Sequence, residues 1–470
     1  MILSLVLVSY FAAVVTLAWL GYQRTRTEAD FIVAGRSLGA LLGGATLAAT
    51  QISAGTFVGT VGLHYLAGVS FVWAWPGAWL GWFVAAVFVA PKLQAAGVMT
   101  VPEYCEVRFG SRAVRAVAAA LIVIAYTVYL VAQYKASGIL VSAVLGWPAW
   151  TGMALVVAST VVYSLLGGLH GSARIDLFQS VVIAGGLVAA VPYLVGHLGG
   201  LEALGRELAQ LDPRLTGWYY GWREILSFGA AFGLSLAATP LEITRFMAMR
   251  DPATARYAIG VAYVFQAVIG SAVMIIGLSM RALFPELPSP DLASAVMMAH
   301  VLTPVAGSLL IVAAFSAIMS TVNAVLLVAG ASVAHDLWAR FLRPLATDAE
   351  RLRANRVAVV LLALAPVWFA IREVTLVQFI VLAQANLTAS AFFAPVVIGL
   401  NWRRGTRAGA LAAMLAGTAV VVAWSLPESA PLGLDPIVAG VGTSILAVVA
   451  GSAAGRFGPA EAGPHIRGST

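Results

Sequence analysis

The chain has 470 residues, of which 61% are hydrophobic and only 10% are charged. Soluble domains carry about 25% charged residues, so this composition excludes an ordinary soluble enzyme or binding domain and indicates a membrane protein with many spans. The net charge of +7 arises in the loops between those spans and implies no nucleic-acid partner, and the single cysteine, Cys105, excludes an intrachain disulfide.

Long uncharged runs, each near the ~20 residues that cross a bilayer, recur along the whole chain. The first run lacks a basic n-region and a cleavage site, so it is expected to be a retained helix and not a signal peptide. Residues 1–455 are expected to form a single transmembrane domain, and residues 456–470 a short disordered cytoplasmic tail. The thirteen predicted spans are residues 2–22, 38–64, 71–91, 113–144, 148–167, 177–196, 226–247, 255–283, 304–335, 355–372, 376–400, 408–426 and 434–454.

The basic residues are divided unevenly between the two alternating sets of loops. Loops that follow odd-numbered spans hold 21 lysines and arginines, whereas loops that follow even-numbered spans hold 5. Cytoplasmic loops of membrane proteins are enriched in these residues. The distribution therefore predicts a multi-pass protein of the inner (plasma) membrane with its N-terminus outside and its C-terminus in the cytoplasm.

The second span contains the polar segment "ATQISAGT" at residues 49–56. One interpretation is close helix packing, because small residues dominate helix interfaces in membranes. The favoured interpretation is an unwound segment at residues 49–55, since irregular backbone is tolerated in a membrane where it lines a cavity or is buried in protein. Such breaks offer free carbonyl oxygens to a cation.

The ninth span contains "AAFSAIMSTVNAVLL" at residues 313–327. Ala317, Ser320 and Thr321 have the spacing i, i+3, i+4 and therefore share one helix face. Each hydroxyl could instead bond to a carbonyl of its own helix. Hydroxyl and carbonyl oxygens are ligands that hard cations prefer, and a site without a carboxylate suits a weakly held monovalent ion better than calcium.

Several segments occur in the order typical of one family: "ADFIVAGRSLG", "TLAATQISAGTFVG", "TVPEYCEVRFG", "GGLHGSARIDLFQS" and "AAFSAIMSTVNAVLL". With them the chain resembles the sodium:solute symporter family, and with "LGLDPIVAG" its sodium/pantothenate-type branch. The resemblance implies an all-α polytopic protein of the LeuT-type fold. Its 13 transmembrane helices would then include two inverted five-helix repeats, formed by spans 2–6 and 7–11.

The resemblance also implies a sodium site between the second and ninth spans. The family's ligands match the backbone carbonyls of Ala49, Ile52 and Ala317 and the hydroxyls of Ser320 and Thr321. Asp176 matches an acid on the ion's route inward. At the cytoplasmic start of its predicted helix, Asp176 could equally be a residue that the helix dipole favours.

The solute site is expected at the midplane, where the two repeats meet. Trp73 and Trp75 could instead belong to an aromatic belt, and Lys135 could snorkel to the outer surface. Glu242 and Arg245 are expected to form a structural pair or a gate. The candidate solute-binding residues are Gln51, Ser53, Thr56, Trp75, Lys135, Gln384 and Asn386.

These expectations describe a sodium-coupled secondary active symporter that imports a small polar or anionic organic solute by alternating access, with a pantothenate-like carboxylate favoured. Its partners would be sodium as the co-transported ion, the solute and the lipid bilayer, with no protein partner implied. The alternatives are a proton-coupled or ion-independent carrier of the same fold, or a transporter-like sensor. An enzyme is not expected, since the six histidines form no HExxH motif and no Ser/His/Asp set is recognisable.

Overall fold

The structure is a computed structural model that describes residues 2–23, 25–372, 375–426 and 435–454. Helices make up most of these residues, and the only β-pairing among them is an isolated bridge between Leu38 and Met249. The tail that the sequence predicts to be disordered, residues 456–470, lies outside the described residues.

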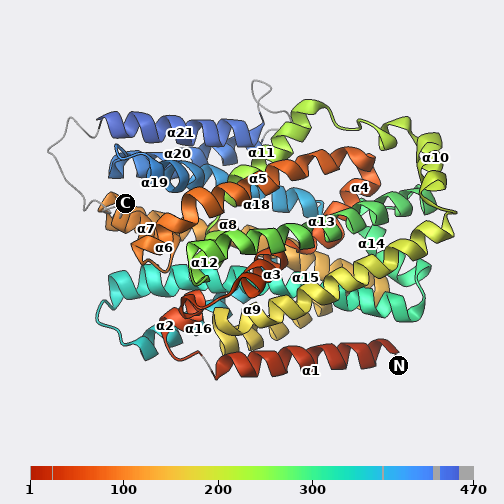
Figure 1. The fold of residues 1–470 in the computed structure, drawn as a ribbon, viewed down its shortest axis with the longest axis horizontal. Helices are drawn as coiled ribbons and strands as arrows, with labels where there is room; N and C mark the ends of the chain where they lie inside the picture. Colours follow the sequence, from red (N-terminus) through yellow and green to blue (C-terminus); the bar gives the residue numbers. More distant parts are fainter. Residues whose placement is uncertain (1, 24, 373–374, 427–434, 455–470) are drawn as a thin grey trace.

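Every predicted span corresponds to one or more helices (Figure 1). In span order these are α1 (Ile2–Tyr22); α3 (Ala40–Gln51), η2 (Gly55–Thr60) and α4 (Val61–Ala67); η3 (Gly68–Ala74), α5 (Trp75–Val84), η4 (Ala85–Val89) and α6 (Ala90–Ala96); α8 (Arg112–Leu145); α9 (Ala149–His197), which covers the fifth and sixth spans; α11 (Trp222–Ala238) and α12 (Pro240–Ala248); α13 (Pro252–Leu283); α15 (Pro304–Ala331) and η8 (Ser332–Leu342); α16 (Asp348–Leu364) and α17 (Val367–Ala370); α18 (Val377–Phe392), η9 (Phe393–Ile398) and α19 (Gly399–Asn401); α20 (Arg407–Ser425); and α21 (Pro436–Ala454).

Shorter helices lie in the connections between the spans. They are α2 (Glu28–Val33), η1 (Ala34–Arg36), α7 (Val101–Phe109), α10 (Leu201–Leu211), η5 (Pro213–Thr216), η6 (Pro290–Leu292), α14 (Ala293–Val296) and η7 (Met297–Val301).

Two glycines divide long helical stretches into separate spans. Among the described residues, ten stretches are long and apolar enough to cross a membrane, and the pair α11 and α12, bent by 42°, makes an eleventh. Gly68 (φ 66°) separates α4 from α5, and Gly168 (φ 50°) interrupts α9, both with a positive φ that glycine adopts without steric cost. Since two of the ten stretches are divided in this way, the number of spans agrees with the predicted thirteen.

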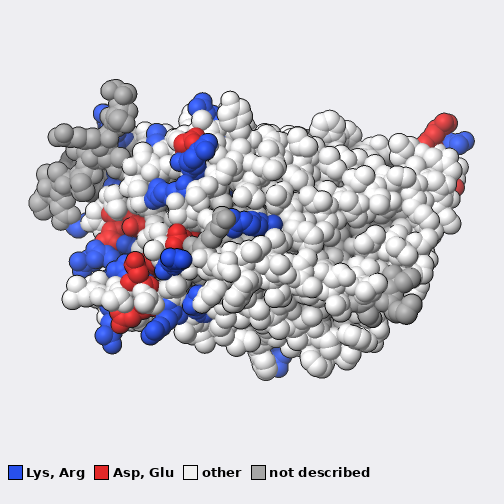
Figure 2. Space-filling model, turned by 60° about the horizontal axis from the view of Figure 1, so that its bottom comes forward, with Lys and Arg blue, Asp and Glu red and all other residues white. Residues whose placement is uncertain are grey.

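The charged side chains gather at one end of the molecule. Figure 2 shows lysine, arginine, aspartate and glutamate concentrated there, with a long, nearly uncharged region beside them. This is the end at which α6, α7 and α16 lie in Figure 1, whereas the N-terminus and α10 lie at the opposite end. The nearly uncharged region has the character expected of a surface that contacts lipid tails, and large apolar side chains such as Leu5, Phe83 and Val264 are exposed.

The first helix of each predicted five-helix repeat is broken near its middle. In the second span α3 ends at Gln51, Ile52 is extended (ψ 97°), and the helix resumes at Gly55. In the seventh span α11 ends at Ala238, and α12 begins after the extended residue Thr239 (ψ 127°). The unwound segment of the second span is therefore shorter than predicted, since Ala49 is still helical. The matching breaks are consistent with the two repeats.

Candidate functional site

The break in the second span faces α15, and the predicted cation ligands meet there. The Oγ of Ser320 lies 3.0 Å from the carbonyl oxygen of Ala49 and 3.0 Å from that of Ala317. The Oγ1 of Thr321 lies 3.1 Å from the Ala317 oxygen, 3.2 Å from that of Thr50 and 3.5 Å from that of Ile52. All five predicted ligands thus lie within one small cluster of uncharged oxygen atoms.

Helix geometry explains how α15 presents this cluster. The hydroxyls of Ser320 and Thr321 each lie within hydrogen-bond distance of a carbonyl of their own helix and of one on α3. Each has one hydrogen to share between them, so both interpretations of the sequence remain compatible with the structure. Ser316, one turn earlier on α15, donates to Val312 of its own helix at 2.7 Å, and it also bonds to the side chain of Tyr10 on α1. Ser316 and Ser320 are four residues apart and share a helix face, so it is the position along α15, one turn away from the break, that separates Ser316 from the hydroxyls that reach it.

Asp176 lies next to this cluster and is fully buried. The sequence places it at the end of a loop, but α9 resumes directly after Gly168, so Asp176 lies about two turns inside a helix. It accepts hydrogen bonds from the hydroxyls of Thr46 on α3 and Ser172, the latter at 3.4 Å. Ser172 in turn accepts from the amide of Asn323 on α15. A buried polar chain thus joins α15, α9 and α3 on the side of the cluster towards the charged end.

A small cavity of about 110 Å³ adjoins the break. Four of the predicted solute-binding residues, Gln51, Ser53, Thr56 and Trp75, line it. The other lining residues are Gly55, Thr60, Phe71, Ala78, Trp79, Trp82, Tyr129, Phe232, Leu236, Gln266, Gly270, Val273, Gln378 and Val381. No lysine, arginine, aspartate or glutamate belongs to this lining.

The remaining three candidates lie outside the cavity lining. Lys135 on α8 donates a hydrogen bond to the carbonyl oxygen of Thr375, and it acts electrostatically on Asp291. Gln384 donates to Thr388 of its own helix at 2.6 Å, and Asn386 is buried in α18.

Glu242 and Arg245 lie in the half-helix α12 and are both fully buried. The carboxylate of Glu242 accepts a hydrogen bond from Gln51 at 2.6 Å, which links the two broken helices. The guanidinium of Arg245 lies in the electrostatic field of Asp176 and Glu242 without a direct hydrogen bond to either. The expected pair is therefore part of a wider buried group of charges.

Sequence reasoning missed three polar residues that contact this region. Gln133 and Tyr126 on α8 bond to the backbone at the two breaks, and Gln378 on α18 lines the cavity. The segment "YTVYLVAQYKASG" places seven polar side chains, three of them tyrosines, within an apolar span. That pattern could have singled out α8, although it does not reveal which backbone groups these side chains meet.

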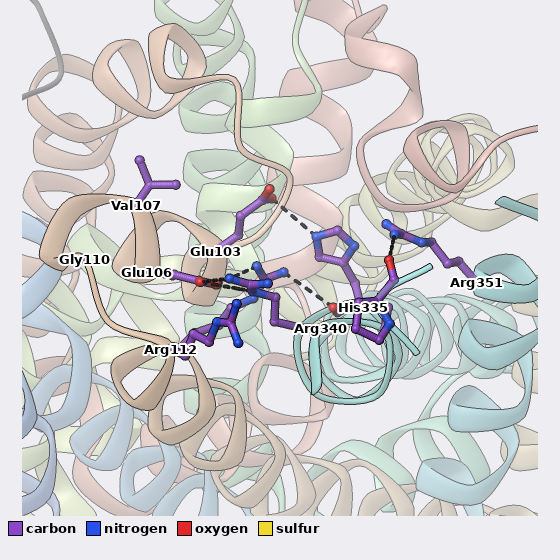
Figure 3. A pocket seen from close by; sticks show the side chains of 11 residues that line it. Glu103, Glu106, Val107, Gly110, Arg112, His335, Arg340 and Arg351 are labelled. Atoms are coloured by element: carbon purple, nitrogen blue, oxygen red, sulfur yellow. Dashed lines mark hydrogen bonds and ion pairs between the residues drawn. The ribbon is translucent and has the colours of Figure 1, made fainter. Parts of the chain in front are cut away.

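A larger cavity of about 670 Å³ opens at the charged end of the molecule. Glu106 of α7 pairs there with Arg340 and with Arg115, the latter at 3.0 Å (Figure 3). Hydrogen bonds from Arg340, and then from Arg115, hold the pKa of the Glu106 carboxyl below its usual range. The ring of His335 lies 3.4 Å from Glu103. These ion pairs tie α7, α8 and η8 together, and they lie apart from the two helix breaks.

The sequence model of the sodium:solute symporter family matches residues 31–417. The osmoregulated proline transporter OpuE of Bacillus subtilis is 28% identical over 88% of this chain and 87% of its own length. The high-affinity proline transporter PutP of the same organism is 29% identical, over 90% of each chain. The sodium/pantothenate symporter of Escherichia coli is 27% identical over 91% of this chain and 90% of its own length.

Solved structures agree with this fold. A Na⁺-coupled sialic acid symporter in a substrate-bound, outward-open state superposes with a TM-score of 0.86 at 17% identity, over 98% of both chains. The nucleobase-cation-symport-1 transporter Mhp1, in a closed conformation, gives a TM-score of 0.56 at 16% identity, over 91% of this chain and 95% of its own. The predicted LeuT-type fold is thereby confirmed.

Proposed function

The chain belongs to the sodium:solute symporter family, and from this premise we propose that it imports a small zwitterionic solute, such as an amino or imino acid, by alternating access. At the coarser level it is a multi-pass membrane protein and a sodium-coupled symporter, whose co-transported ion is sodium. The relatives described above are transporters and not enzymes.

The single observation that carries the mechanism is the meeting of five uncharged oxygens between α3 and α15. The carbonyls of Ala49, Ile52 and Ala317 and the hydroxyls of Ser320 and Thr321 would hold sodium there. A hard cation prefers such oxygen ligands, and each hydroxyl needs only to turn its hydrogen away from the ion. Because no ligand carries a charge, the ion remains releasable. Asp176 and the polar chain around it would form the start of its route inward.

The cavity beside the break supports a small zwitterion over a longer anion. Its volume of about 110 Å³ is below the ~300 Å³ at which pockets for drug-sized ligands begin. Its lining holds no cationic side chain to meet a solute carboxylate, so the bound sodium would supply that charge. Trp75, Trp79 and Trp82 offer aromatic faces that attract an ammonium group. Lys135, the residue that favoured an anionic solute, lies outside this lining.

Transport by purified protein in sealed liposomes tests the proposal. With an inward sodium gradient, labelled proline is expected to accumulate, and replacing sodium by choline should reduce accumulation to the background of empty liposomes. Labelled pantothenate, assayed in parallel, tests the longer carboxylate. Proline uptake that persists in choline and follows a proton gradient would instead favour the proton-coupled alternative, and accumulation of pantothenate alone would refute the small zwitterion.

The charged end of the molecule indicates how the chain is oriented in the membrane. Because lysine and arginine favour the cytoplasmic side, the end that carries α7 and α16 would face the cytoplasm and α10 would face outward. In a Cys105→Ser background, a cysteine at exposed Glu207 of α10 is expected to react with a membrane-impermeant maleimide in intact cells. A cysteine at exposed Ala349 of α16 should react only after permeabilisation, and its labelling from outside would reverse the proposed topology.

A further inference from the structure

The backbone at the first helix break is held by a side chain from a third helix. Where α3 gives way to η2, the amide of Ala54 has left the helical hydrogen-bond pattern and donates to the Oε1 of Gln133 at 2.9 Å. The neighbouring amides of Ser53 and Gly55 find partners within the same segment, in the hydroxyls of Thr56 and Ser53. Of the partners of these three backbone amides, Gln133 is thus the one that comes from outside the segment.

The second break is held from the same helix. The amide of Leu241, at the start of α12, donates to the hydroxyl of Tyr126 at 2.7 Å, and that hydroxyl also lies 3.1 Å from the Oγ1 of Thr239. Tyr126 and Gln133 are seven residues apart on α8, which is close to two helical turns. They therefore lie on one face of α8, and both are fully buried.

Only the first of these two breaks lies against the proposed sodium ligands. The amide that Gln133 accepts belongs to the peptide between Ser53 and Ala54, and the carbonyl of Ile52 belongs to the peptide directly before it. When the peptide plane between Ser53 and Ala54 is fixed, the peptide plane between Ile52 and Ser53 can turn relative to it only about the two backbone bonds of Ser53. The Ile52 carbonyl is thereby kept turned towards Thr321, at 3.5 Å.

We propose that Gln133 is a positioning residue for the sodium site, acting through the backbone of residues 52–54 without contacting the ion. The inference rests on the proposed sodium site at Ala49, Ile52, Ala317, Ser320 and Thr321. Without Gln133 the unwound segment would sample several conformations, and sodium binding would have to order it. Fixing the backbone of a residue costs conformational entropy, so part of the free energy of sodium binding would be lost.

Sodium binding to the purified protein tests this inference without knowledge of the solute. Tryptophan fluorescence and the thermal unfolding midpoint are followed while sodium chloride replaces choline chloride at constant ionic strength. Gln133→Leu replaces the glutamine by an apolar side chain of similar size, which cannot accept the hydrogen bond of the Ala54 amide. We expect this variant to raise the half-maximal sodium concentration about tenfold, which corresponds to ~1.4 kcal/mol. Gln133→Asn withdraws the acceptor by one methylene and should shift the midpoint in the same direction if the leucine variant does not fold.

Three further variants separate positioning from a general structural role. Gln133→Glu keeps an acceptor for the Ala54 amide, so its sodium midpoint should not rise above that of the wild type. Tyr126→Phe removes the equivalent contact at the break without sodium ligands. It should lower the unfolding temperature and leave the sodium midpoint unchanged. Gln179→Leu is the control for placing a leucine where a buried glutamine amide was. Gln179 is as buried as Gln133, but it bonds to Tyr10 and not to the helix break, so its sodium midpoint should stay that of the wild type.

The outcomes are distinguishable. A wild-type sodium midpoint in folded Gln133→Leu or Gln133→Asn would overturn the inference and leave the sodium site intact. An equal rise in Tyr126→Phe or Gln179→Leu would also overturn it, since the effect would then be a general loosening of the fold. If the wild-type protein itself does not respond to sodium, the proposed sodium site fails, and the role of Gln133 fails with it.

Discussion

The double variant Ser320→Ala/Thr321→Ala is expected to lose sodium-dependent uptake almost completely. Each hydroxyl removed is one of the five proposed ligands, and a lost hydrogen-bonding or coordinating group in a buried site costs ~1–3 kcal/mol. Two such losses weaken sodium binding roughly 30-fold to more than 10³-fold. Each single variant should raise the half-maximal sodium concentration, which uptake measured over a range of external sodium will report.

Ser316→Ala provides the matched control for this experiment. Ser316 lies on the same helix and is equally buried, but its hydroxyl bonds to the carbonyl of Val312 and to Tyr10 of α1 rather than to the broken helix. Its removal should therefore leave the sodium dependence unchanged. If the folded double variant keeps the wild-type sodium dependence, the ligands lie elsewhere and the assignment of the site is wrong.

Local sequence spacing grouped the α15 side of this cluster, because that side is helical, whereas Ala49 and Ile52 were named only from the family resemblance. Residues at i, i+3 and i+4 share a face in any α-helix, so Ala317, Ser320 and Thr321 could be grouped before their partner was known. The break opposite them was also detectable, since a run of small and polar residues cannot form an ordinary lipid-facing segment. The long uncharged runs gave the number of spans, which the helices reproduce, and the alternation of basic loops supported that number.

Contacts between distant helices could not be predicted in the same way. Gln133 and Lys135 are two residues apart on α8 and equally conspicuous in the sequence, yet one bonds to the helix break and the other to the Thr375 carbonyl. Which of them faces the break depends on how α8 is rotated against α3 and α18, and spacing within α8 carries no information about that rotation. The solute candidates Gln384 and Asn386 lie outside the cavity lining for the same reason.

The sequence predicted a loop between the fifth and sixth spans, before Asp176, but in the structure the single residue Gly168 connects the two spans. Polar and basic residues at "GLHGSARID" resemble a loop, but the chain turns at Gly168 alone and α9 resumes at once. A Cβ on Gly168 would lie 2.7 Å from the ring of Phe31, so close packing as well as the positive φ requires glycine there. The buried position of Asp176 follows from that short turn.

Arg115→Met is expected to cause the largest loss of stability of any single substitution considered. Arg115 pairs with Asp336 at 2.8 Å, and the side chain of Asp336 has no exposed surface. Removing the guanidinium leaves that carboxylate buried with only the Thr100 hydroxyl as a hydrogen-bond donor, at 2.7 Å. Loss of one partner from a buried ion pair costs ~3–5 kcal/mol. The thermal unfolding temperature of the purified protein measures the effect.

Two further variants show whether the unpaired carboxylate is the cause. Asp336→Asn added to Arg115→Met removes the buried charge, so the double variant should recover much of the lost stability, whereas a simple cavity would not be repaired. Arg214→Met breaks a pair of the same length, 2.8 Å, but the Arg214 side chain is 64% exposed, and exposed pairs contribute ~0–1 kcal/mol. η8 continues directly from α15, which carries Ser320 and Thr321, so the loss of stability in Arg115→Met is expected to weaken sodium binding as well. A double variant that regains its unfolding temperature should also bind sodium like the wild type. If the double variant is stable but binds sodium weakly, the ion pair acts on the sodium site directly, and not only by supporting the fold.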